Sequence, residues 1–329
     1  MQARNLLAAI AFATCAAVPA RGVCPGDCRG DGAVAVDELV SLVNIALGAL
    51  PETSCEAGDR DGDGAVDVTE LVRAVQAALE GCPPPASILS AFFGLDDALP
   101  SIVERICPGG AGTDGMPVVF SDEINQDTLD ADDFVVITAG GVEKVPRCVT
   151  HLPAGEENED RTVLLIGDLG DAVEDPPASV VVSGRLFGET AGNLQGLETD
   201  RVTPLAAGPF LVHAEVVEAG EQELGRPGNG GGCPLEGTLQ VVKVTWAGGV
   251  VATSGEELGD AERMRYRVTF EDGSQIVPFA LADLNDNDNN HDLCLDDARR
   301  PVRIGMGEDT VIDPNGDPNP HMFVLLPPQ

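Results

Sequence analysis

The chain has 329 residues and a formal net charge of −36, from 55 acidic and only 19 basic side chains. Nucleic acids and anionic membrane faces bind positive patches, so this balance argues against both as partners. After the N-terminal segment, no run is long and apolar enough to form a transmembrane helix, so no transmembrane anchor is expected.

The N-terminus has the pattern of an export signal. Arg4 supplies a positive charge, residues 6–17 form an apolar run too short for a comfortable membrane span, and residues 18–20 offer a small-residue cleavage site. We therefore predict that residues 1–20 are a signal peptide. The mature protein is then expected to be secreted or displayed at the cell surface.

Two copies of one acidic loop follow, starting at Asp27 and at Asp59, a spacing of 59 − 27 = 32 residues. The second copy has carboxylates at loop positions 1, 3, 5, 9 and 12 and a glycine at position 6. A Ca²⁺ ion takes about six to eight oxygen ligands, and this spacing gathers oxygens around one point. The predicted ligands of loop two are Asp59, Asp61, Asp63, the Ala65 carbonyl, Asp67 and Glu70.

Loop one keeps fewer of these ligands. Its predicted set is Asp27, Asp31, the Ala33 carbonyl and Glu38. Arg29 replaces the acid at position 3 and Ala35 replaces the acid at position 9, so we expect weaker calcium binding than in loop two. The alternative for either loop is a solvated acidic turn that binds no metal.

An amphipathic helix is predicted after each loop, because apolar residues recur at the spacing of one helix face. They are Val36, Leu39, Val40, Val43 and Leu47 in the first unit, and Val68, Leu71, Val72, Val75 and Leu79 in the second. Neither helix buries such a stripe alone, so we expect the two stripes to pack together. Gly48 and Gly81 are the expected helix stops.

The order loop, helix, linker, loop, helix over residues 24–82 resembles a type I dockerin. Dockerins bind a cohesin domain on scaffold proteins of cellulose-degrading bacteria. The resemblance implies a calcium-ordered module that docks onto a cohesin-like protein or another envelope or extracellular component. An ordinary EF-hand also has a helix before each loop, whereas residues 23–26 and 50–57 contain proline and cysteine instead.

The module departs from well-studied dockerins at the residues that touch the partner. Those dockerins often carry a Ser-Thr pair at loop positions 10 and 11, where this chain has Val36-Asp37 and Val68-Thr69. Position 12 is usually Asp and is Glu38 or Glu70 in this chain. The resemblance therefore carries over the calcium ligands and not the identity of the partner.

Eight of the nine cysteines remain once Cys15 is removed with the signal segment. An even number in an oxidising compartment indicates disulfides. Four cysteines lie in the calcium module and four beyond it, and each set of four allows three pairings. We favour Cys24–Cys82, Cys28–Cys55, Cys107–Cys148 and Cys233–Cys294. Zinc ligation is the weaker alternative, since no C-x-x-C pair stands near another Cys or His pair.

Beyond Pro83-Pro84-Pro85, short β-rich runs are separated by Gly, Pro, Asn and Asp. The runs are residues 117–120, 134–138, 162–166, 180–182, 210–217, 239–246, 264–270 and 322–326. Many short strands with turn signals between them predict β-sandwiches. The expected fold class is therefore mainly β, with two β-sandwich domains, at 84–208 and 209–329, preceded by a small all-α calcium-binding module at 21–83.

The first β domain resembles the bacterial Ig-like domains of surface and envelope proteins. The resemblance rests on Pro117–Ile124, Thr128-Leu129, the Phe134–Val136 strand and Ala191–Leu194, within roughly residues 88–205. Such domains act as spacers and adhesive units, and the resemblance implies no catalytic residues. The second β domain resembles no family that its residues identify.

Residues 283–292 form a second acidic cluster. Residues 283–287 spell D-x-N-D-N, which resembles the calcium linker string of cadherins. Alternating carboxylates and amides suit calcium, so an extra calcium site is expected near Asp283–Asp292. Asp260 and Glu262 are the distant acidic partners that the sequence offers. The alternative is a polar loop in which Asn and Asp cap their own turns.

No catalytic motif is found: H-E-x-x-H, G-x-S-x-G and a phosphate-binding glycine loop are all absent from the sequence. We therefore predict a non-enzymatic, calcium-binding surface or secreted protein whose N-terminal module docks β-sandwich domains onto a partner. A polysaccharide-degrading hydrolase with facing carboxylates and Trp246 in a C-terminal cleft is one alternative. A calcium-stabilised adhesin that uses residues 283–292 is the other.

Overall fold

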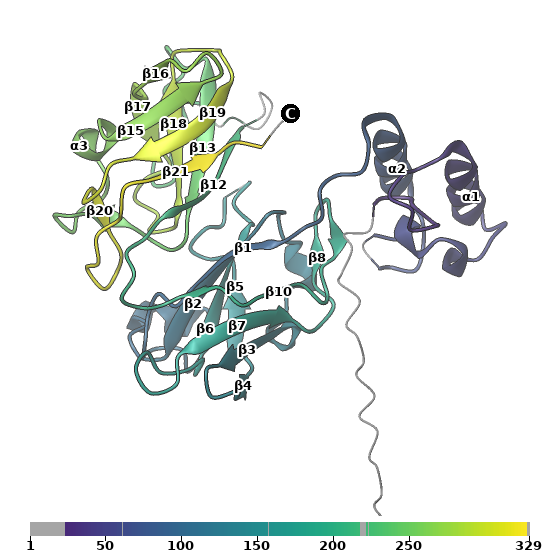
Figure 1. Cartoon of the computed structure of the whole chain (residues 1–329), viewed down its shortest axis with the longest axis horizontal. Helices are drawn as coiled ribbons and strands as arrows, with labels where there is room; N and C mark the ends of the chain where they lie inside the picture. Colours follow the sequence, from purple (N-terminus) through teal and green to yellow (C-terminus); the bar gives the residue numbers. More distant parts are fainter. Residues whose placement is uncertain (1–23, 61, 157, 218–221, 223, 328–329) are drawn as a thin grey trace, which may run out of the picture.

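The computed structural model describes residues 24–60, 62–156, 158–217, 222 and 224–327. The predicted signal peptide lies outside these residues. Along the chain, a helical module (residues 24–82) precedes two β units, and the predicted mainly β fold class is confirmed (Figure 1). Within the described ranges, no helix has the length and apolar character needed to cross a membrane.

The helical module contains two α-helices, each of which begins at position 10 of a predicted loop. They are α1 (Val36–Ala46) and α2 (Val68–Glu80), and the linker forms the short 3₁₀ turns η1 (Glu52–Ser54) and η2 (Glu56–Gly58). Gly48 and Gly81 have φ angles of +70° and +95°. This region of φ favours glycine, so both residues end their helices as predicted.

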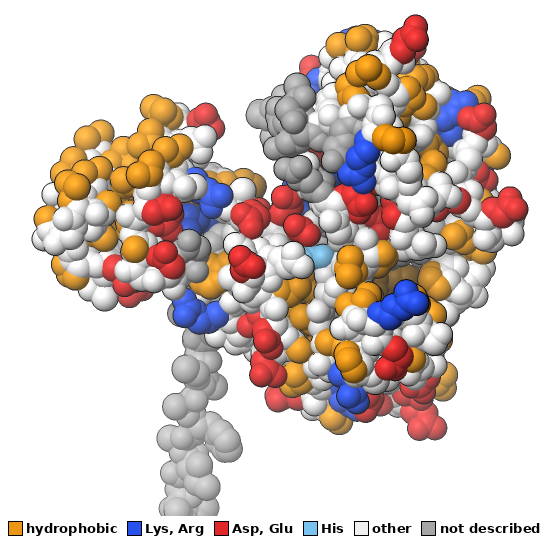
Figure 2. Space-filling view, turned by 180° about the vertical axis from the view of Figure 1, so that it is seen from behind, with side chains coloured by type: hydrophobic (Ala, Val, Ile, Leu, Met, Phe, Trp, Pro, Cys, Tyr) orange, Lys and Arg blue, Asp and Glu red, His pale blue; other side chains and the backbone are white. Residues whose placement is uncertain are grey.

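Four of the five residues of each predicted apolar stripe face solvent, so the prediction that the two stripes pack together is wrong for them. The fifth residue of each stripe, Leu39 or Leu71, is partly buried and packs against the module core. The exposed side chains are Val36, Val40, Val43 and Leu47 on α1, and Val68, Val72, Val75 and Leu79 on α2. Their exposure runs from 43% at Val75 to 79% at Leu79. We call these eight residues the apolar face, and Figure 2 shows hydrophobic side chains gathered on the module.

The helices instead pack through a second set of positions, which the repeat also duplicates. The buried side chains are Glu38, Leu42 and Ile45 on α1, and Glu70, Ala74 and Ala77 on α2. Leu42 lies in the module core with Cys55 and Val66. The alanines of α2 are small enough to let α1 approach, so the core fills without the apolar face.

The first β unit, which we call the first sandwich, packs two sheets around one core. Its larger sheet has the order β11-β1-β2-β6-β5, with β1 (Ile88–Phe92), β2 (Asp114–Phe120), β5 (Cys148–Thr150), β6 (Thr162–Gly167) and β11 (Val202–Thr203). The facing sheet has the order β10-β7-β3-β4, with β3 (Phe134–Thr138), β4 (Glu143–Lys144), β7 (Pro177–Val182) and β10 (Glu198–Thr199). Both sheets supply the core, for example Val118, Phe134 and Val180.

Short elements decorate this sandwich. They are the hairpin β8 (Phe187–Gly188) and β9 (Gly192–Asn193), and the 3₁₀ turns η3 (Ser101–Arg105), η4 (Gln126–Thr128) and η5 (Ala131–Asp133). The hairpin is the part of the first sandwich that lies beside the helical module (Figure 1).

The second β unit, the second sandwich, has the same plan. One sheet has the order β12-β13-β18-β17, with β12 (Leu211–Val216), β13 (Gln240–Trp246), β17 (Ala280–Ala282) and β18 (Asn290–Leu295). The other has the order β16-β15-β19-β21, with β15 (Tyr266–Phe270), β16 (Gln275–Ile276), β19 (Pro301–Met306) and β21 (Met322–Leu325). The remaining elements are β14 (Val251–Ala252), β20 (Val311–Ile312) and α3 (Asp260–Arg263). Trp246, Tyr266 and Phe270 lie in the core between the sheets.

All eight predicted β-rich runs contain a strand. The long strands that the prediction missed are β1, β18 and β19. β18 is the least expected, because it begins with Asn290, His291 and Asp292, which the sequence placed in an acidic loop. Pairing with β13 and β17 on both sides outweighs the poor strand propensity of Asn and Asp.

The four favoured disulfides are all present. Cys24–Cys82 and Cys28–Cys55 tie the helical module, Cys107–Cys148 ties the first sandwich, and Cys233–Cys294 ties the second. The first closes the ends of the module, where little apolar surface is available to stabilise it.

The packing of the module predicts opposite outcomes for two neighbouring residues. Leu42→Ala should destabilise the module by about 2–5 kcal/mol, because Leu42 is fully buried. Val43→Ala should change stability by about 0.5 kcal/mol or less, because its side chain belongs to the exposed face. Denaturant unfolding followed by helical circular dichroism measures both. Equal losses in the two variants would contradict the assigned orientation of α1.

Candidate functional site

Both loops fold around their first residue in the same way. The Asp27 carboxylate accepts hydrogen bonds from the Asp31 and Gly32 N–H groups, at 3.1 and 2.7 Å. The Asp59 carboxylate accepts from the Asp63 and Gly64 N–H groups, at 3.1 and 2.9 Å. Each loop therefore curls so that position 1 lies opposite positions 5 and 6, which is what a loop that wraps a cation requires.

The last carboxylate of each loop is buried beneath the same turn. Glu38 Oε2 accepts from the Ala35 N–H at 2.8 Å, and Glu70 Oε2 accepts from the Asp67 N–H at 2.9 Å. These bonds cap the two helices as well as closing the loops. Glu38 and Glu70 thus hold the loop and the helix start together before any ion is considered.

Loop one contains its own cation. The Arg29 guanidinium lies 3.1 Å from Glu38 Oε2, 3.5 Å from Asp31 Oδ2 and 3.1 Å from Asp37 Oδ2. Asp37 and Glu38 are the main reason that the pKa of Arg29 is raised. Two of the predicted calcium ligands of loop one, Asp31 and Glu38, are therefore engaged by a side chain of fixed positive charge. Ala33, whose carbonyl was the third, is exposed.

Loop two offers only oxygen donors, the ligand type of a hard cation. Its described carboxylates are not among the acidic groups that gather ligand oxygens within 4.8 Å in the described part of the chain. Asp59, Asp63 and Glu70 lie within one loop, and the Ala65 N–H donates to Asp63 Oδ1 at 2.8 Å. Gly64 has a φ of +88° and open space where a side chain would begin. Asp67 also caps α2, because its Oδ1 accepts from the Glu70 N–H at 2.9 Å. The sixth predicted ligand, Asp61, lies outside the described residues.

Loop two also contacts the first sandwich. The buried guanidinium of Arg60 donates to the Thr190 carbonyl, and burial lowers the pKa of Arg60 to about 10. In return, Arg185 donates to the Gly62 carbonyl at 3.1 Å. Gly62 has a φ of +71° and no room for a side chain against Phe187 and Arg185. The conformation of loop two is thus coupled to the position of the helical module on the first sandwich.

The two sandwiches meet at a junction built on charged and amide side chains. Arg161 of the first sandwich donates to both carboxylate oxygens of Glu215, at 3.0 and 2.9 Å. The Asn289 side-chain amide donates to Thr162 Oγ1 at 3.0 Å and to the Trp246 carbonyl at 2.7 Å. Bidentate Arg–carboxylate pairs are strong and directional, so these contacts define how the sandwiches sit together.

Lys243, one of only two lysines in the chain, is buried at this junction. Its Nζ lies 2.6 Å from Glu159 Oε1, 3.0 Å from Asp283 Oδ2 and 3.4 Å from Asp292 Oδ1. Glu159 comes from the first sandwich and the two aspartates from the second. A single ammonium group therefore faces three carboxylates, of which Glu159 and Asp283 are buried and Asp292 is half-buried, and the contact with Glu159 crosses the junction.

A group of acids lies beside this lysine. Glu156, Glu159 and Asp288 each place a carboxylate oxygen within 4.8 Å of the others. Part of the predicted acidic cluster 283–292 is thus brought to acids that lie more than a hundred residues earlier in the chain. The predicted partners Asp260 and Glu262 do not take this role: Asp260 pairs with Arg263, and Glu262 accepts from the Gly259 N–H.

Burial perturbs the acids of this group. It raises the pKa of Glu159 to about 10, with further increases from the nearby charges of Asp283 and Asp288, against the effect of Lys243. Burial also raises the pKa of Asp288 to about 6. Asp286 shifts in the same direction, again chiefly through burial. The common cause is negative charge removed from water without enough positive charge beside it.

Sequence reasoning missed Glu156 and Glu159, because nothing local connects them to residues 283–292. Lys243 carried the signal that could have found them. It stands in the β-rich run Val241-Val242-Lys243-Val244, where an isolated charge must be paired if the strand is buried. The sequence does not say which acids pair with it, since that depends on how the two sandwiches meet.

Much of the acidic cluster is buried. Asp283 and residues 288–291 are buried, Asn285 and Asn287 are exposed, and Asp286 is half-buried. The part of the segment that is open to solvent is therefore the short stretch 284–287.

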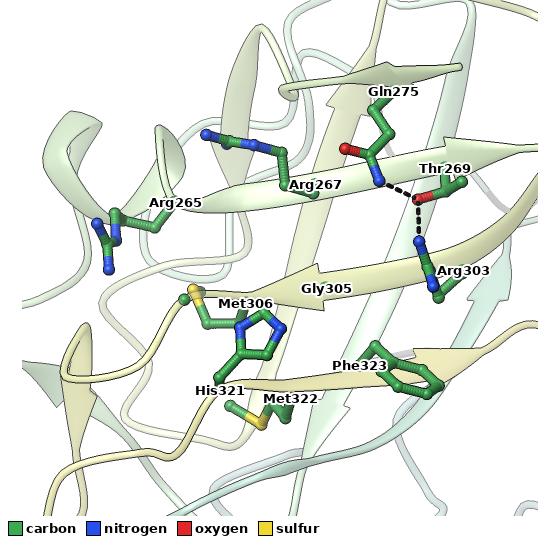
Figure 3. A pocket seen from close by; sticks show the side chains of 11 residues that line it. Arg265, Arg267, Thr269, Gln275, Arg303, Gly305, Met306, His321, Met322 and Phe323 are labelled. Carbon is green, nitrogen blue, oxygen red and sulfur yellow. Dashed lines mark hydrogen bonds between the residues drawn. The ribbon is translucent and has the colours of Figure 1, made fainter. Parts of the chain in front are cut away.

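A basic groove of about 360 Å³ lies on the second sandwich (Figure 3). Arg265, Arg267, Arg303 and His321 line it, and Arg303 stacks 5.4 Å from the centre of the Phe323 ring. The described lining includes no carboxylate, and Trp246 is in the core. The groove therefore lacks the facing carboxylates and the tryptophan that the hydrolase alternative requires.

Comparisons with known proteins identify no family. No family model matches the chain, and no curated protein matches it. Three solved structures of S-layer proteins show detectable similarity. The S-layer protein rSbsC(31-844) has a TM-score of 0.24 and 10% identity, with 88% of this chain and 46% of that chain covered.

The N-terminal part of the bacterial S-layer protein SbsC has a TM-score of 0.25 and 11% identity, with 88% and 58% covered. Domains 1–6 of surface layer protein SbsC have a TM-score of 0.24 and 9% identity, with 88% and 48% covered. The chain thus spans about half the length of these proteins. TM-scores this low do not establish a shared fold.

The junction between the sandwiches predicts a pH dependence that centres on Glu123. Burial raises the pKa of Glu123 to about 7, and the charges of Glu215, Asp160 and Asp122 raise it further. The positive charge of Arg161 lowers this pKa and offsets only part of the shift. A carboxyl whose pKa is higher in the folded state favours folding when protonated, so stability should fall between about pH 4.5 and pH 7. His213 and Arg161 lower the pKa of Glu215 to about 2 despite its burial. Glu215 therefore stays ionised between about pH 4.5 and pH 7, and its contribution to the free energy of unfolding does not change in this range.

Glu123→Gln should therefore raise the thermal midpoint at pH 8, by the equivalent of about 1–3 kcal/mol, and leave it unchanged at pH 4.5. Thermal unfolding at both pH values measures this effect. Asp127→Asn is the matched control on an exposed neighbour and should have no such effect. A gain of equal size at both pH values would show that Glu123 is not the titrating group.

Proposed function

We propose that the protein is a secreted or cell-surface component whose helical module docks two β-sandwiches onto a protein partner in a calcium-dependent way. The observation that carries this proposal is the apolar face. Soluble proteins rarely leave such a contiguous row of aliphatic side chains in water unless another surface covers it. Its eight residues lie at matching places of the internal repeat, so the same pattern is presented twice.

The composition of the apolar face favours a protein partner over a glycan. Residues 24–82 contain no Phe, Tyr or Trp. Sugar-binding surfaces rely on aromatic rings for stacking, whereas flat aliphatic surfaces suit the apolar core of a protein interface. We therefore assign the face to an extracellular or envelope protein with an apolar contact surface, of which a cohesin-like domain is one example.

Calcium is proposed to act through loop two. When bound, calcium would be held by Asp59, Asp61, Asp63, Asp67, Glu70 and the Ala65 carbonyl, and it would neutralise the repulsion among their charges. Glu70 begins the buried side of α2, and Arg60 and Gly62 contact the first sandwich. Ordering this loop would therefore fix α2 in the module and the module on the first sandwich.

Loop one is proposed to stay closed without calcium. Arg29 supplies a positive charge among Asp31, Asp37 and Glu38. Loop two has an acid, Asp61, at the position that Arg29 occupies in loop one. The repeat would then combine one permanently closed half with one half that responds to calcium. Extracellular sites of this kind bind at about 10⁻⁴–10⁻³ M, which matches calcium levels outside cells.

The first test changes the number of bound calcium ions. In titration calorimetry of the full chain, Asp63→Asn should remove one calcium ion relative to the natural protein. Arg29→Asp should add one, because it restores an acid at position 3 and frees Asp31 and Glu38. Arg29→Gln is the control, since it removes the cation without adding a ligand, and it should not create a site of equal affinity. An unchanged count in Asp63→Asn would refute the assignment of loop two.

The second test addresses the apolar face. The full chain is immobilised, and envelope proteins of the source organism are passed over it with calcium and then with chelator. The docking proposal predicts one retained protein that is released by chelation.

Val40→Asp and Val72→Asp should each weaken its binding by about tenfold or more, because a charge enters the centre of the contact. Gln76→Asp adds the same charge on an exposed α2 position outside the face and should bind normally. Retention of the same protein by all variants would contradict the proposal.

A further inference from the structure

We propose that a divalent cation of the calcium type binds at the junction of the two sandwiches, between Glu156, Glu159, Asp286 and Asp288. The first two side chains belong to the first sandwich and the last two to the loop between β17 and β18. The bound ion would lock the two sandwiches together. This site is separate from loop two, and it does not depend on the docking proposal.

An unpartnered carboxylate oxygen is the strongest indication of a missing ligand. Glu159 is 1% exposed, and its Oε1 is bonded to Lys243. Its second oxygen, Oε2, is buried and accepts no hydrogen bond from any described residue. Asp286 Oδ2 is in the same condition. Buried acceptors without a donor are costly, so a positive group is expected to lie between them.

The balance of charge points the same way. The carboxylates of this region are Glu156, Glu159, Asp283, Asp286, Asp288 and Asp292. The basic groups that contact them in the described part of the chain are Lys243 and Arg226. Lys243 is shared among three acids and Arg226 pairs with Glu156, so these two basic groups face six carboxylates. A doubly charged ion would offset this excess at the point where burial is greatest.

The geometry fits a hard cation with oxygen ligands. Glu156, Glu159 and Asp288 place one oxygen each within 4.8 Å of the others, a spacing that a single ion of 2.3–2.6 Å bond length can bridge. Gly230 bounds the site on one side: a methyl group at its Cα would lie 2.6 Å from Glu156 Oε1 and 3.1 Å from both Arg226 Nη2 and Asp286 Oδ2. The two carboxylate oxygens therefore share one small space with the Arg226 guanidinium, which lies 3.2 Å from Glu156 Oε1. Carboxylates without thiolates favour calcium or magnesium over zinc.

A shared proton is the competing explanation for the same carboxylates. Glu159 and Asp283 both bond Lys243 Nζ, so one proton held between them would also lower the local charge. A proton would serve only this pair. It would leave Asp286 Oδ2 and the approach of Glu156 to Asp288 unexplained, whereas one cation accounts for all four acids.

A second acidic group in the first sandwich shows what a satisfied cluster looks like. Asp96, Asp97 and Asp114 also lie close together. Both oxygens of Asp114 accept backbone hydrogen bonds, from Asp97 at 2.9 Å and from Leu169 at 2.7 Å. Asp96 accepts from Ala172 at 3.1 Å. This group needs no ion and provides a matched control.

The experiment uses the full chain with loop two silenced by Asp59→Asn and Asp63→Asn, so that calcium bound elsewhere can be counted. Calorimetric titration with calcium should still detect one ion. Adding Asp288→Asn should weaken this site by about 10–100-fold, because one charged ligand is lost while the shape is kept. Asp97→Asn, added instead, should leave binding unchanged. Loss of this ion in the loop-two variant alone would mean that loop two was the only site, which would overturn the junction site and leave the docking proposal standing.

Hydrogen exchange provides a readout that does not depend on affinity. In the same silenced chain, calcium should slow exchange of residues 158–162 and 284–290 together, because they lie on opposite sides of the ion. Asp288→Asn should abolish this slowing. If calcium protects neither segment, or if Asp288→Asn binds calcium normally, the shared proton is the correct explanation and the proposed site is wrong.

Discussion

The contact between Lys243 and its three carboxylates is the constraint on which the arrangement of the two sandwiches depends. Breaking a buried ion pair by removing one partner costs about 3–5 kcal/mol, because the remaining charge is left without compensation. Glu159 reaches this lysine from the first sandwich, and Asp283 and Asp292 reach it from the second. Lys243 is also paired within the second sandwich, whereas the buried Glu159 of the first sandwich reaches this lysine only across the junction, so its charge favours one relative position of the two sandwiches.

The same principle recurs along the chain. With 55 acids against 19 basic residues, every buried or clustered carboxylate competes for few cations. Arg29 closes loop one, Arg60 joins loop two to the first sandwich, and Arg161 pairs with Glu215 between the sandwiches. In loop two and among the acids beside Glu159, we infer that a divalent ion adds positive charge. Calcium would then control two joints of the molecule, one at each end of the first sandwich.

The apolar face gives this control a purpose. The module buries one set of repeated positions and leaves the other set in water. The apolar face is therefore not part of the module core and is free for a partner to cover. A calcium-ordered joint beneath such a face would determine whether the β-sandwiches are presented rigidly or loosely. The described groove of the second sandwich is lined by arginines, and the arrangement expected of a glycoside hydrolase is not found there.

Sequence predicted the local features well. Short-range patterns predicted the loop repeat, both helices with their glycine stops, and eight strands, and all of these are present. The four disulfides, which the even number of cysteines indicated, are present as well. The orientation of the helices was predicted wrongly, because the longest apolar stripe was taken to be the buried one. Leu42, Ile45 and the small Ala74 and Ala77 fill the core instead, and their pattern is visible in the repeat only when the small residues are counted as core.

The junction could not be predicted, because its members are far apart in the chain. Residues 283–292 indicated a cation site, yet their acidic partners come from residues 156–159, and no periodicity connects the two segments. Only the lone lysine in an apolar strand hinted at them. Joints between domains depend on tertiary placement of charge, and a sequence pattern records only that a charge is present.

The most direct test of this account is a crystal structure of the full chain grown with calcium, with the ions located by their anomalous scattering. The account predicts one peak among Asp59, Asp63 and Glu70, a second among Glu156, Glu159 and Asp288, and none beside Arg29. Anomalous density beside Arg29, or its absence at both of the other positions, would contradict the claim that this acidic chain is joined by cations.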